Sequence, residues 1–249
     1  MRLVHDALRA GQAAPPRTPA RARRVLVAGG AGALGAAVLE SLLASRGFDE
    51  VAVLVTQPIN AALRGLATVS KAQLEDGAVN AEDTALVVFD RERHANGREA
   101  AFLRPQPQAL PLLAAALYRR GVRDLIVVMP HATATLPDAL KRGLATLDEQ
   151  AVAALGFDHL VFVRSAQPPA ALRAASALQR VADWVLSQLQ LMIPQRERPV
   201  RAQKVAQFVV QVALRLPATA HGTRVAPPEL VWEAGQTKDL EGLAAGWLA

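Results

Sequence analysis

The sequence predicts an α/β protein built around a doubly wound parallel sheet. From Arg24 onward, short apolar runs alternate with stretches whose hydrophobic residues recur at helical spacing, which is the pattern of successive βαβ units. A glycine-rich turn joins the first apolar run to the first helical stretch, and 51% of the 249 residues are hydrophobic. That share is large enough for helices to cover both faces of such a sheet.

The strands are expected where apolar residues run continuously, because the strands of a parallel sheet are buried on both faces. They are residues 25–29, 51–55, 67–69, 84–90, 124–130 and 158–164. Joined by right-handed crossovers, these segments give the doubly wound arrangement.

The helices are expected where hydrophobic residues recur every three or four positions. They are residues 33–47, 110–121, 138–155, 169–193 and 200–216. Gly47 and Gly121 are expected to end the first two, since glycine readily adopts the left-handed backbone of a helix C-terminus. Residues 165–249, with an extended piece at 223–232, are expected to form a small, mainly helical portion over the strand ends, where ligands bind in doubly wound folds.

The basic charge of the chain is concentrated at its N-terminus. The net charge is +6, and residues 1–24 carry six arginines and one aspartate, so the rest is nearly neutral. We expect residues 1–23 to be an exposed, flexible leader and residues 24–249 to be a single domain. No aromatic residue lies among the arginines of the leader, so a stacking site for nucleic acid is not expected.

The composition also disfavours several other kinds of site. The chain has no cysteine, which excludes disulfides and thiolate chemistry and favours a cytoplasmic location. Its apolar runs are broken well short of the length of a membrane span, about 20 residues. Its five histidines show no spacing typical of metal ligands. We therefore expect neither a membrane contact nor a metal site.

The turn after the first strand predicts a dinucleotide site. Its glycines satisfy both G-x-G-x-x-G and G-x-x-G-x-x-G, and they would allow a sharp turn, close approach of a diphosphate and tight helix packing. The helix that follows would offer free N–H groups and its positive dipole end to the phosphates. A tight turn without a ligand is the alternative. The candidate cofactor-binding residues are Gly29, Gly30, Ala31, Gly32, Ala33, Leu34 and Gly35.

The choice between NAD and NADP is expected at the end of the second strand. An acidic residue there would hold a ribose hydroxyl, and an arginine would accept a 2′-phosphate. The chain has Thr56 and Gln57 at this place, followed by Pro58. Both polar side chains can bond either ribose form, and Arg64 is near only if the loop folds back. NADP is favoured over NAD, because no carboxylate would repel the phosphate.

Four stretches carry a resemblance to a known family. They are "VAGGAGALG", "GVRDLIVVMPH", "LDEQAVAALGFDHLVFVRSA" and "VRAQKVAQFVVQVAL". Over residues 24–215 the chain resembles atypical short-chain dehydrogenases/reductases, in particular the NADPH-binding oxidoreductases of the Tat-interacting-protein type and their bacterial epimerase-like relatives. The resemblance implies a Rossmann-like fold, a nicotinamide dinucleotide, and catalysis by a serine and a Tyr-x-x-x-Lys pair.

The chain departs from this family at the catalytic positions. Its single tyrosine, Tyr118, precedes the fifth strand and has no lysine four residues later. Aligned on Arg164, the family's serine, tyrosine and lysine fall near Pro130, Lys141 and Ala145. His131 and Lys141 are the candidates for a substitute proton-transfer role, and solvated side chains are the alternative.

A second departure follows the fourth strand, where the family has small residues. Here Asp90 is followed by Arg91, Glu92 and Arg93. If these charges point outward, they form a solvated loop. If they point inward, they occupy or reshape the path of the cofactor, and the arginines grip a phosphate or an acidic substrate. Later in the chain, the neighbouring Asp148 and Glu149 are expected to form a capped or solvated helix face.

These observations lead to one favoured function and two alternatives. The favoured function is an NAD(P)-binding protein with a binding or regulatory role and without the Tyr-x-x-x-Lys chemistry. The first alternative is an active NAD(P)-dependent oxidoreductase or sugar-nucleotide epimerase that acts on a small-molecule substrate through substitute residues. The second is an interaction scaffold with a vestigial nucleotide site. The helical stripe of residues 169–193 is expected to pack on its own domain, and a surface for homo-oligomerisation is the alternative.

Overall fold

A computed structural model of the chain describes residues 22–57, 65–76, 82–90, 101–129, 144, 146–164 and 202–249. Several sequence predictions concern residues outside these ranges. They are the leader up to residue 21, the charged loop 91–100, the candidates His131 and Lys141, and the helix expected at 169–193.

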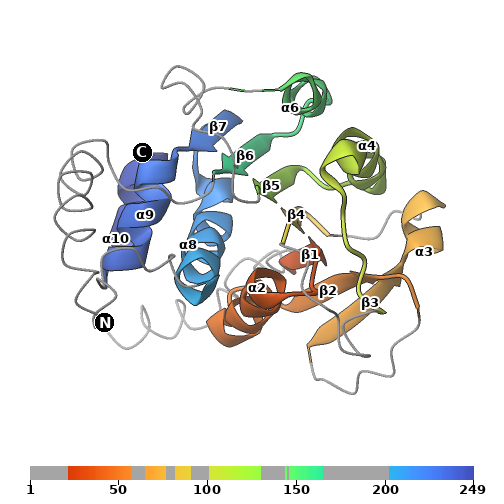
Figure 1. Ribbon diagram of the computed structural model, residues 1–249, viewed down its shortest axis with the longest axis horizontal. Coiled ribbons are helices and arrows are strands. Elements are labelled where there is room, and N and C mark those ends of the chain that lie inside the picture. Colours follow the sequence, from red (N-terminus) through yellow and green to blue (C-terminus); the bar gives the residue numbers. More distant parts are fainter. Residues whose placement is uncertain are drawn as a thin grey trace, which may run out of the picture.

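The described residues contain a seven-stranded parallel sheet with the strand order β3-β2-β1-β4-β5-β6-β7 (Figure 1). The strands are β1 (Arg24–Ala28), β2 (Glu50–Val55), β3 (Leu66–Ser70), β4 (Thr84–Val88), β5 (Asp124–Val128), β6 (His159–Val163) and β7 (Gly222–Ala226). This confirms the predicted doubly wound fold and all six expected strands. The order reverses between β1 and β4, so the switch point of the fold lies at the carboxyl ends of these two strands.

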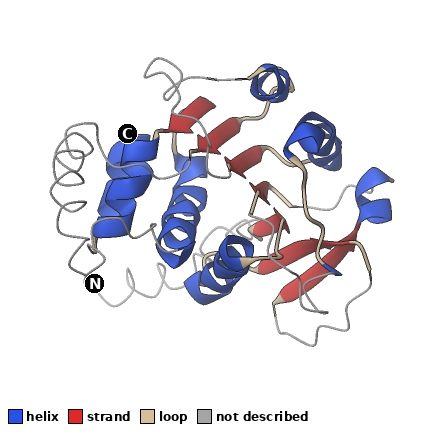
Figure 2. Ribbon diagram, in the orientation of Figure 1, coloured by secondary structure: helices blue, strands red, loops and turns tan. Residues whose placement is uncertain are grey.

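Helices cover both faces of the sheet (Figures 1 and 2). One face carries α2 (Ala33–Ser45), α8 (Ala202–Arg215), α9 (Pro228–Gln236) and α10 (Leu240–Leu248), and the other carries α3 (Lys71–Glu75), α4 (Leu110–Arg120) and α6 (Leu147–Ala153). Short 3₁₀ turns, Pro107–Ala109 and Leu216–Ala218, precede α4 and follow α8. Among these helices, none combines the length and apolar character needed to cross a membrane.

Each face has its own hydrophobic core, because alternate residues of each strand point to opposite sides. In β1, Val25 and Val27 pack with α2 and α8, whereas Leu26 and Ala28 pack on the side of α4 and α6. All four side chains are at most 1% exposed.

Residues 202–249 differ from the sequence prediction in their placement. They were expected over the strand ends, but α8 packs beside α2 on the sheet, and α9 and α10 extend the same layer. The extended piece expected at 223–232 is β7 followed by α9, and β7 pairs in parallel with β6. The described C-terminal residues therefore add an edge strand to the sheet and three helices to one of its layers.

The C-terminal ends of α2 and α4 show two different uses of glycine. Gly121 ends α4 as predicted, with φ at 106°, and its N–H donates to the carbonyls of Leu117 and Tyr118. The prediction for Gly47 was wrong by one residue, because the residue that caps the C-terminus of α2 is Arg46, which adopts φ at 51°. A Cβ on Gly47 would lie 2.2 Å from Leu214 Cδ2, so Gly47 allows the close approach of α8.

Candidate functional site

The candidate site lies at the switch point, where β1 ends and α2 begins. Gly29 follows β1 with φ at 104°, and Gly32 precedes α2 with φ at 91°. Residues other than glycine rarely adopt such backbone angles. The turn predicted from the glycine spacing is therefore present, and it places the N-terminus of α2 at the carboxyl edge of the sheet.

Three of the four glycines face the protein itself. A Cβ on Gly29 would lie 2.0 Å from the carbonyl oxygen of Val88, and one on Gly35 would lie 1.9 Å from that of Gly29. A Cβ on Gly30 would lie 2.9 Å from Leu39 and 3.0 Å from Val53. Glycine at these three positions therefore allows β1, β4 and α2 to pack closely.

Gly32 faces the carboxylate of Asp90, which lies two residues after the end of β4. A Cβ on Gly32 would lie 2.6 Å from Asp90 Oδ2. The backbone N–H of Leu34 donates to this oxygen at 2.6 Å, and that of Gly35 does so at 3.4 Å. Of the two orientations considered for the charges after the fourth strand, Asp90 therefore adopts the inward one. Arg91 and Arg93 lie outside the described residues.

Asp90 acts as the N-cap that the sequence around α2 does not supply. Gly32 occupies the N-cap position without a side chain, and the first turn of α2 has no acidic residue. A helix N-terminus has unsatisfied N–H groups and a positive dipole end, both of which attract an anionic oxygen. Asp90, half-buried at the end of β4, provides that oxygen.

This contact also tests whether the site fits a diphosphate. A phosphate oxygen and a carboxylate oxygen are both anionic acceptors, so the N–H groups of Leu34 and Gly35 suit either. Asp90 Oδ2 stands where the phosphate oxygen would accept these bonds. The site therefore fits a diphosphate on the condition that the Asp90 side chain rotates away.

The end of β2 is lined by a second segment of the chain. Residues 101–103 run antiparallel to it, with a bridge between Val55 and Phe102 and a hydrogen bond from Leu103 N–H to the Leu54 carbonyl at 2.9 Å. The backbone N–H and the hydroxyl of Thr56 both donate to the Ala101 carbonyl, at 2.8 and 3.1 Å.

The proton of the Thr56 hydroxyl is thus committed to the protein backbone. Gln57 is exposed beside it. Phe102 also closes the back of the glycine turn, since its Cδ1 would lie 3.2 Å from a Cβ on Gly30. No motif in the sequence links residues 101–103 to the second strand, so their position here could not be predicted.

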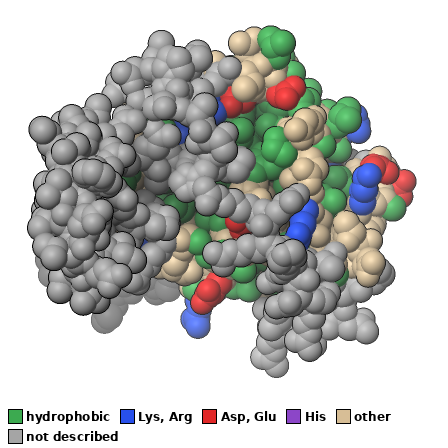
Figure 3. All heavy atoms as spheres, viewed as in Figure 1, with side chains coloured by type: hydrophobic (Ala, Val, Ile, Leu, Met, Phe, Trp, Pro, Cys, Tyr) green, Lys and Arg blue, Asp and Glu red, His purple; other side chains and the backbone are tan. Residues whose placement is uncertain are grey.

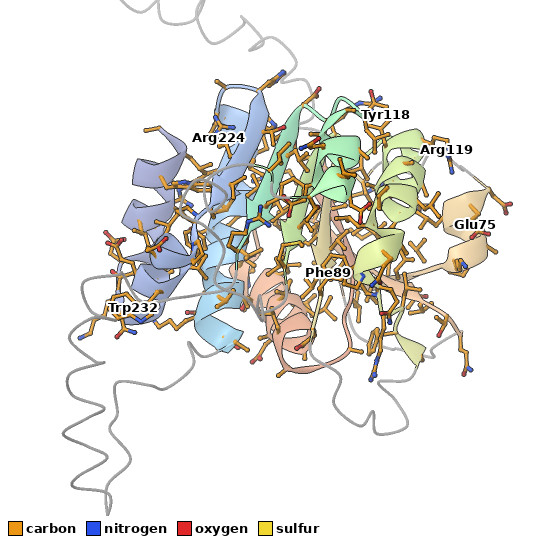
Figure 4. The ribbon with its side chains drawn as sticks, turned by 45° about the horizontal axis from the view of Figure 1, so that its top comes forward. Glu75, Phe89, Tyr118, Arg119, Arg224 and Trp232 are labelled. Carbon is orange, nitrogen blue, oxygen red and sulfur yellow. The ribbon has the colours of Figure 1, made fainter. Side chains whose placement is uncertain are left out.

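Tyr118, the only tyrosine of the chain, lies at the opposite edge of the sheet. It is in the last turn of α4, which leads into the amino end of β5. Its ring packs edge-on against Phe157 at 5.2 Å, and the Arg123 guanidinium lies 4.6 Å above it. Figure 4 shows Tyr118 well separated from Phe89, the residue before Asp90. Tyr118 is therefore a packing residue and not a proton donor at the glycine turn.

Glu149 and Arg164 form a buried ion pair at the carboxyl end of β6. The guanidinium contacts both carboxylate oxygens, with Nη2 donating to Oε2 at 2.8 Å. Only 1% of the Glu149 side chain is exposed, so the solvated face considered for this residue is wrong. Asp148 is exposed. The pair ties α6 to the sheet, and Thr146 caps this helix by accepting from the Glu149 N–H.

A third group of titratable residues lies at the amino edge, away from the site. The carboxylate of Asp124, at the start of β5, is 2.7 Å from Nδ1 of His159, at the start of β6. Burial raises the pKa of Asp124 above its ordinary value, against the lowering effect of His159. The other ring nitrogen of His159 lies 3.3 Å from the Thr219 carbonyl. Within the described ranges, no cluster of three or more potential ligands could hold a metal ion.

Comparisons with known proteins find likeness in structure alone. No family model matches the chain, and no curated protein matches it. Among solved structures, a Rossmann-fold NAD(P)-binding family protein from Shigella flexneri is 15% identical with a TM-score of 0.46, covering 82% of this chain and 92% of its own.

Two enzymes give similar values. UDP-N-acetylglucosamine 4-epimerase from Bacillus cereus is 16% identical with a TM-score of 0.46, covering 83% of this chain and 78% of its own. Uronate dehydrogenase from Agrobacterium tumefaciens is 13% identical with a TM-score of 0.47, covering 82% and 76%. These structural neighbours include NAD(P)-binding, epimerase and dehydrogenase proteins, and their likeness to this chain is one of fold.

Proposed function

We propose that the chain binds a nicotinamide dinucleotide at the switch point and has a binding or regulatory role. The observation that carries this proposal is the convergence of the Leu34 and Gly35 N–H groups on one anionic oxygen. In a doubly wound fold this is the place and the chemistry by which a diphosphate is held.

The residues of the chain would divide the binding as follows. The amides of Leu34 and Gly35 would hold the diphosphate, and Gly32 and Ala33 would let it approach the backbone. Gln57, with the backbone around Thr56, would face the ribose. The absence of a carboxylate on these residues supports NADP over NAD.

A binding role is favoured over catalysis by the position of the tyrosine. A nicotinamide dinucleotide, when bound, supplies hydride transfer, and short-chain dehydrogenases of the family named above pair this with proton transfer from a tyrosine. The only tyrosine here packs against Phe157 at the far edge of the sheet.

A scaffold that binds no nucleotide is the second candidate, and one observation favours it. Asp90 already accepts the two hydrogen bonds that a phosphate would take, and the Ala101 carbonyl already accepts from Thr56. In this second case the glycine turn would serve only to pack β1, β4 and α2 together.

Calorimetric titration with NADPH and NADH separates the two candidates. We expect saturable binding that is tighter for NADPH, and loss of binding in Gly32→Ala, whose Cβ would intrude on the anion position. Gly246→Ala is the matched control, because nothing lies within 4 Å of its added Cβ. Circular dichroism of both variants would check that they fold. Absence of binding to either nucleotide, in the folded wild type and in variants of Asp90, would favour the scaffold.

A further inference from the structure

We propose that Asp90 is an internal competitor for the diphosphate subsite and thereby sets the affinity of the chain for its dinucleotide. This inference rests on the proposed function. It concerns a residue outside the glycine motif, in the segment that follows β4 on the other side of the switch point.

Competition follows from the hydrogen bonds of the free protein. Asp90 Oδ2 accepts from Leu34 N–H at 2.6 Å and lies within reach of Gly35 N–H at 3.4 Å. A backbone N–H has one proton to donate, so the carboxylate and a phosphate oxygen cannot both take it. Two anionic groups at this spacing would also repel each other strongly. Binding therefore requires the carboxylate to leave.

The backbone next to Asp90 is held by contacts that do not involve the Asp90 side chain. Phe89, the preceding residue, is 2% exposed, and its N–H donates to the Val128 carbonyl at 3.0 Å. The backbone of β4 is thus held up to Asp90, while the Asp90 side chain itself is half-buried. In this proposal the Asp90 side chain rotates away from the subsite while the β4 backbone stays in place.

The size of the effect follows from the value of an N-cap. Replacing a capping side chain by alanine removes a contribution that corresponds to about a 2- to 30-fold change in an equilibrium constant. The dinucleotide must overcome this contribution in the wild type and is relieved of it in Asp90→Ala. We therefore expect Asp90→Ala to bind about 2- to 30-fold more tightly. Asp90→Asn, which caps without a charge, should fall between the two.

The test is calorimetric titration of the full chain and its variants with NADPH and NADH. Glu40→Gln is the matched control, because it removes one negative charge from an exposed position on α2 itself. It should leave the affinity unchanged. Hydrogen exchange of the Leu34 amide gives a second readout, since this proton should exchange faster in nucleotide-free Asp90→Ala than in the wild type.

The possible outcomes separate this inference from the proposed function. Tighter binding by Asp90→Ala or Asp90→Asn, with the affinity of Glu40→Gln unchanged, supports both the role of Asp90 and the proposed function. This holds also if the wild type binds too weakly to measure. Binding by the wild type that these variants weaken or leave unchanged overturns the role of Asp90 and keeps the proposed function. Absence of binding in the wild type and in both folded Asp90 variants overturns both. If Asp90→Ala does not fold, Asp90→Asn decides alone.

Discussion

Removing the carboxylate of Glu82 should destabilise the fold far more than removing one from the surface. Arg120 of α4 and Glu82, just before β4, have side chains only 1% and 7% exposed. Nε and Nη2 of the arginine donate to the two carboxylate oxygens at 3.0 and 3.1 Å. The remaining Nη1 donates to the Gln73 carbonyl at 3.1 Å. This pair therefore joins α3, α4 and the start of β4.

Glu82→Ala would leave a buried guanidinium without its counter-charge, which costs about 3–5 kcal/mol of unfolding free energy. Glu75→Ala is the matched control, because Glu75 pairs with Lys71 across one turn of α3 at 3.6 Å, with both side chains more than 60% exposed. Exposed pairs of this kind contribute about 0.3–0.5 kcal/mol. The two glutamates lie on neighbouring segments, and Glu75 projects from the outer end of α3 in Figure 4.

Equilibrium urea unfolding followed by circular dichroism measures both variants. The double variant Arg120→Met/Glu82→Leu should recover most of the loss, because replacing both members of a buried pair with apolar side chains is often close to neutral. If the unfolding free energy of Glu82→Ala lies within about 1 kcal/mol of that of Glu75→Ala, the inferred difference between buried and exposed pairs is refuted.

Three further predictions concern the glycine turn, the amino edge and the tyrosine. Gly35→Ala should lower the unfolding free energy by about 1–3 kcal/mol in urea titrations, since its Cβ would meet a backbone carbonyl at 1.9 Å. Gly246→Ala should leave the unfolding free energy unchanged, because nothing lies near its added Cβ. Equal unfolding free energies for the two variants would contradict this prediction. Because burial raises the pKa of Asp124 in the fold, its contribution to stability is fully present below its ordinary pKa of 3.8 and is lost as the pH rises through the folded pKa. Asp124→Asn should remove this component from the stability profile, measured by urea titration from about pH 3 to about pH 7; an unchanged profile would show that His159 cancels it. Tyr118→Phe should leave dinucleotide affinity unchanged in calorimetry, and a marked loss would place the hydroxyl in the site after all.

The strands of the sheet interior could be predicted from the sequence, but the place of the last edge strand in the sheet could not. β1, β4, β5 and β6 are buried on both faces and read as continuous apolar runs. In β7, only Ala226 is buried and the first two residues are exposed, so this rule does not detect it. Its pairing with β6 is decided by tertiary contacts alone.

The candidate site, too, could be predicted only in part from the sequence. The turn and the helix start follow from the glycine spacing, because the backbone angles of Gly29 and Gly32 constrain the residue type locally. The direction of the Asp90 side chain depends on where β4 lies relative to α2, which the sequence left as two alternatives. Glu149 was missed for a related reason, since the position of Arg164 beside it depends on how α6 packs on β6.

Hydrophobic side chains at the surface were equally hard to foresee. Leu112 of α4 and Leu147 of α6 are 77% and 82% exposed, and Figure 3 shows apolar atoms gathered on the part of this face that the two helices occupy. Helical spacing places leucines on a stripe, but it does not tell which ones a neighbouring element covers.

The capping of α2 by Asp90 links two residues that are 56 positions apart in the chain. During synthesis, α2 therefore emerges long before the group that completes its amino end. Until β4 has joined β1, the amides of that first turn have only water to bond. The amino end of α2, in the opening βαβ unit, therefore gains its carboxylate cap only when β4 is in place.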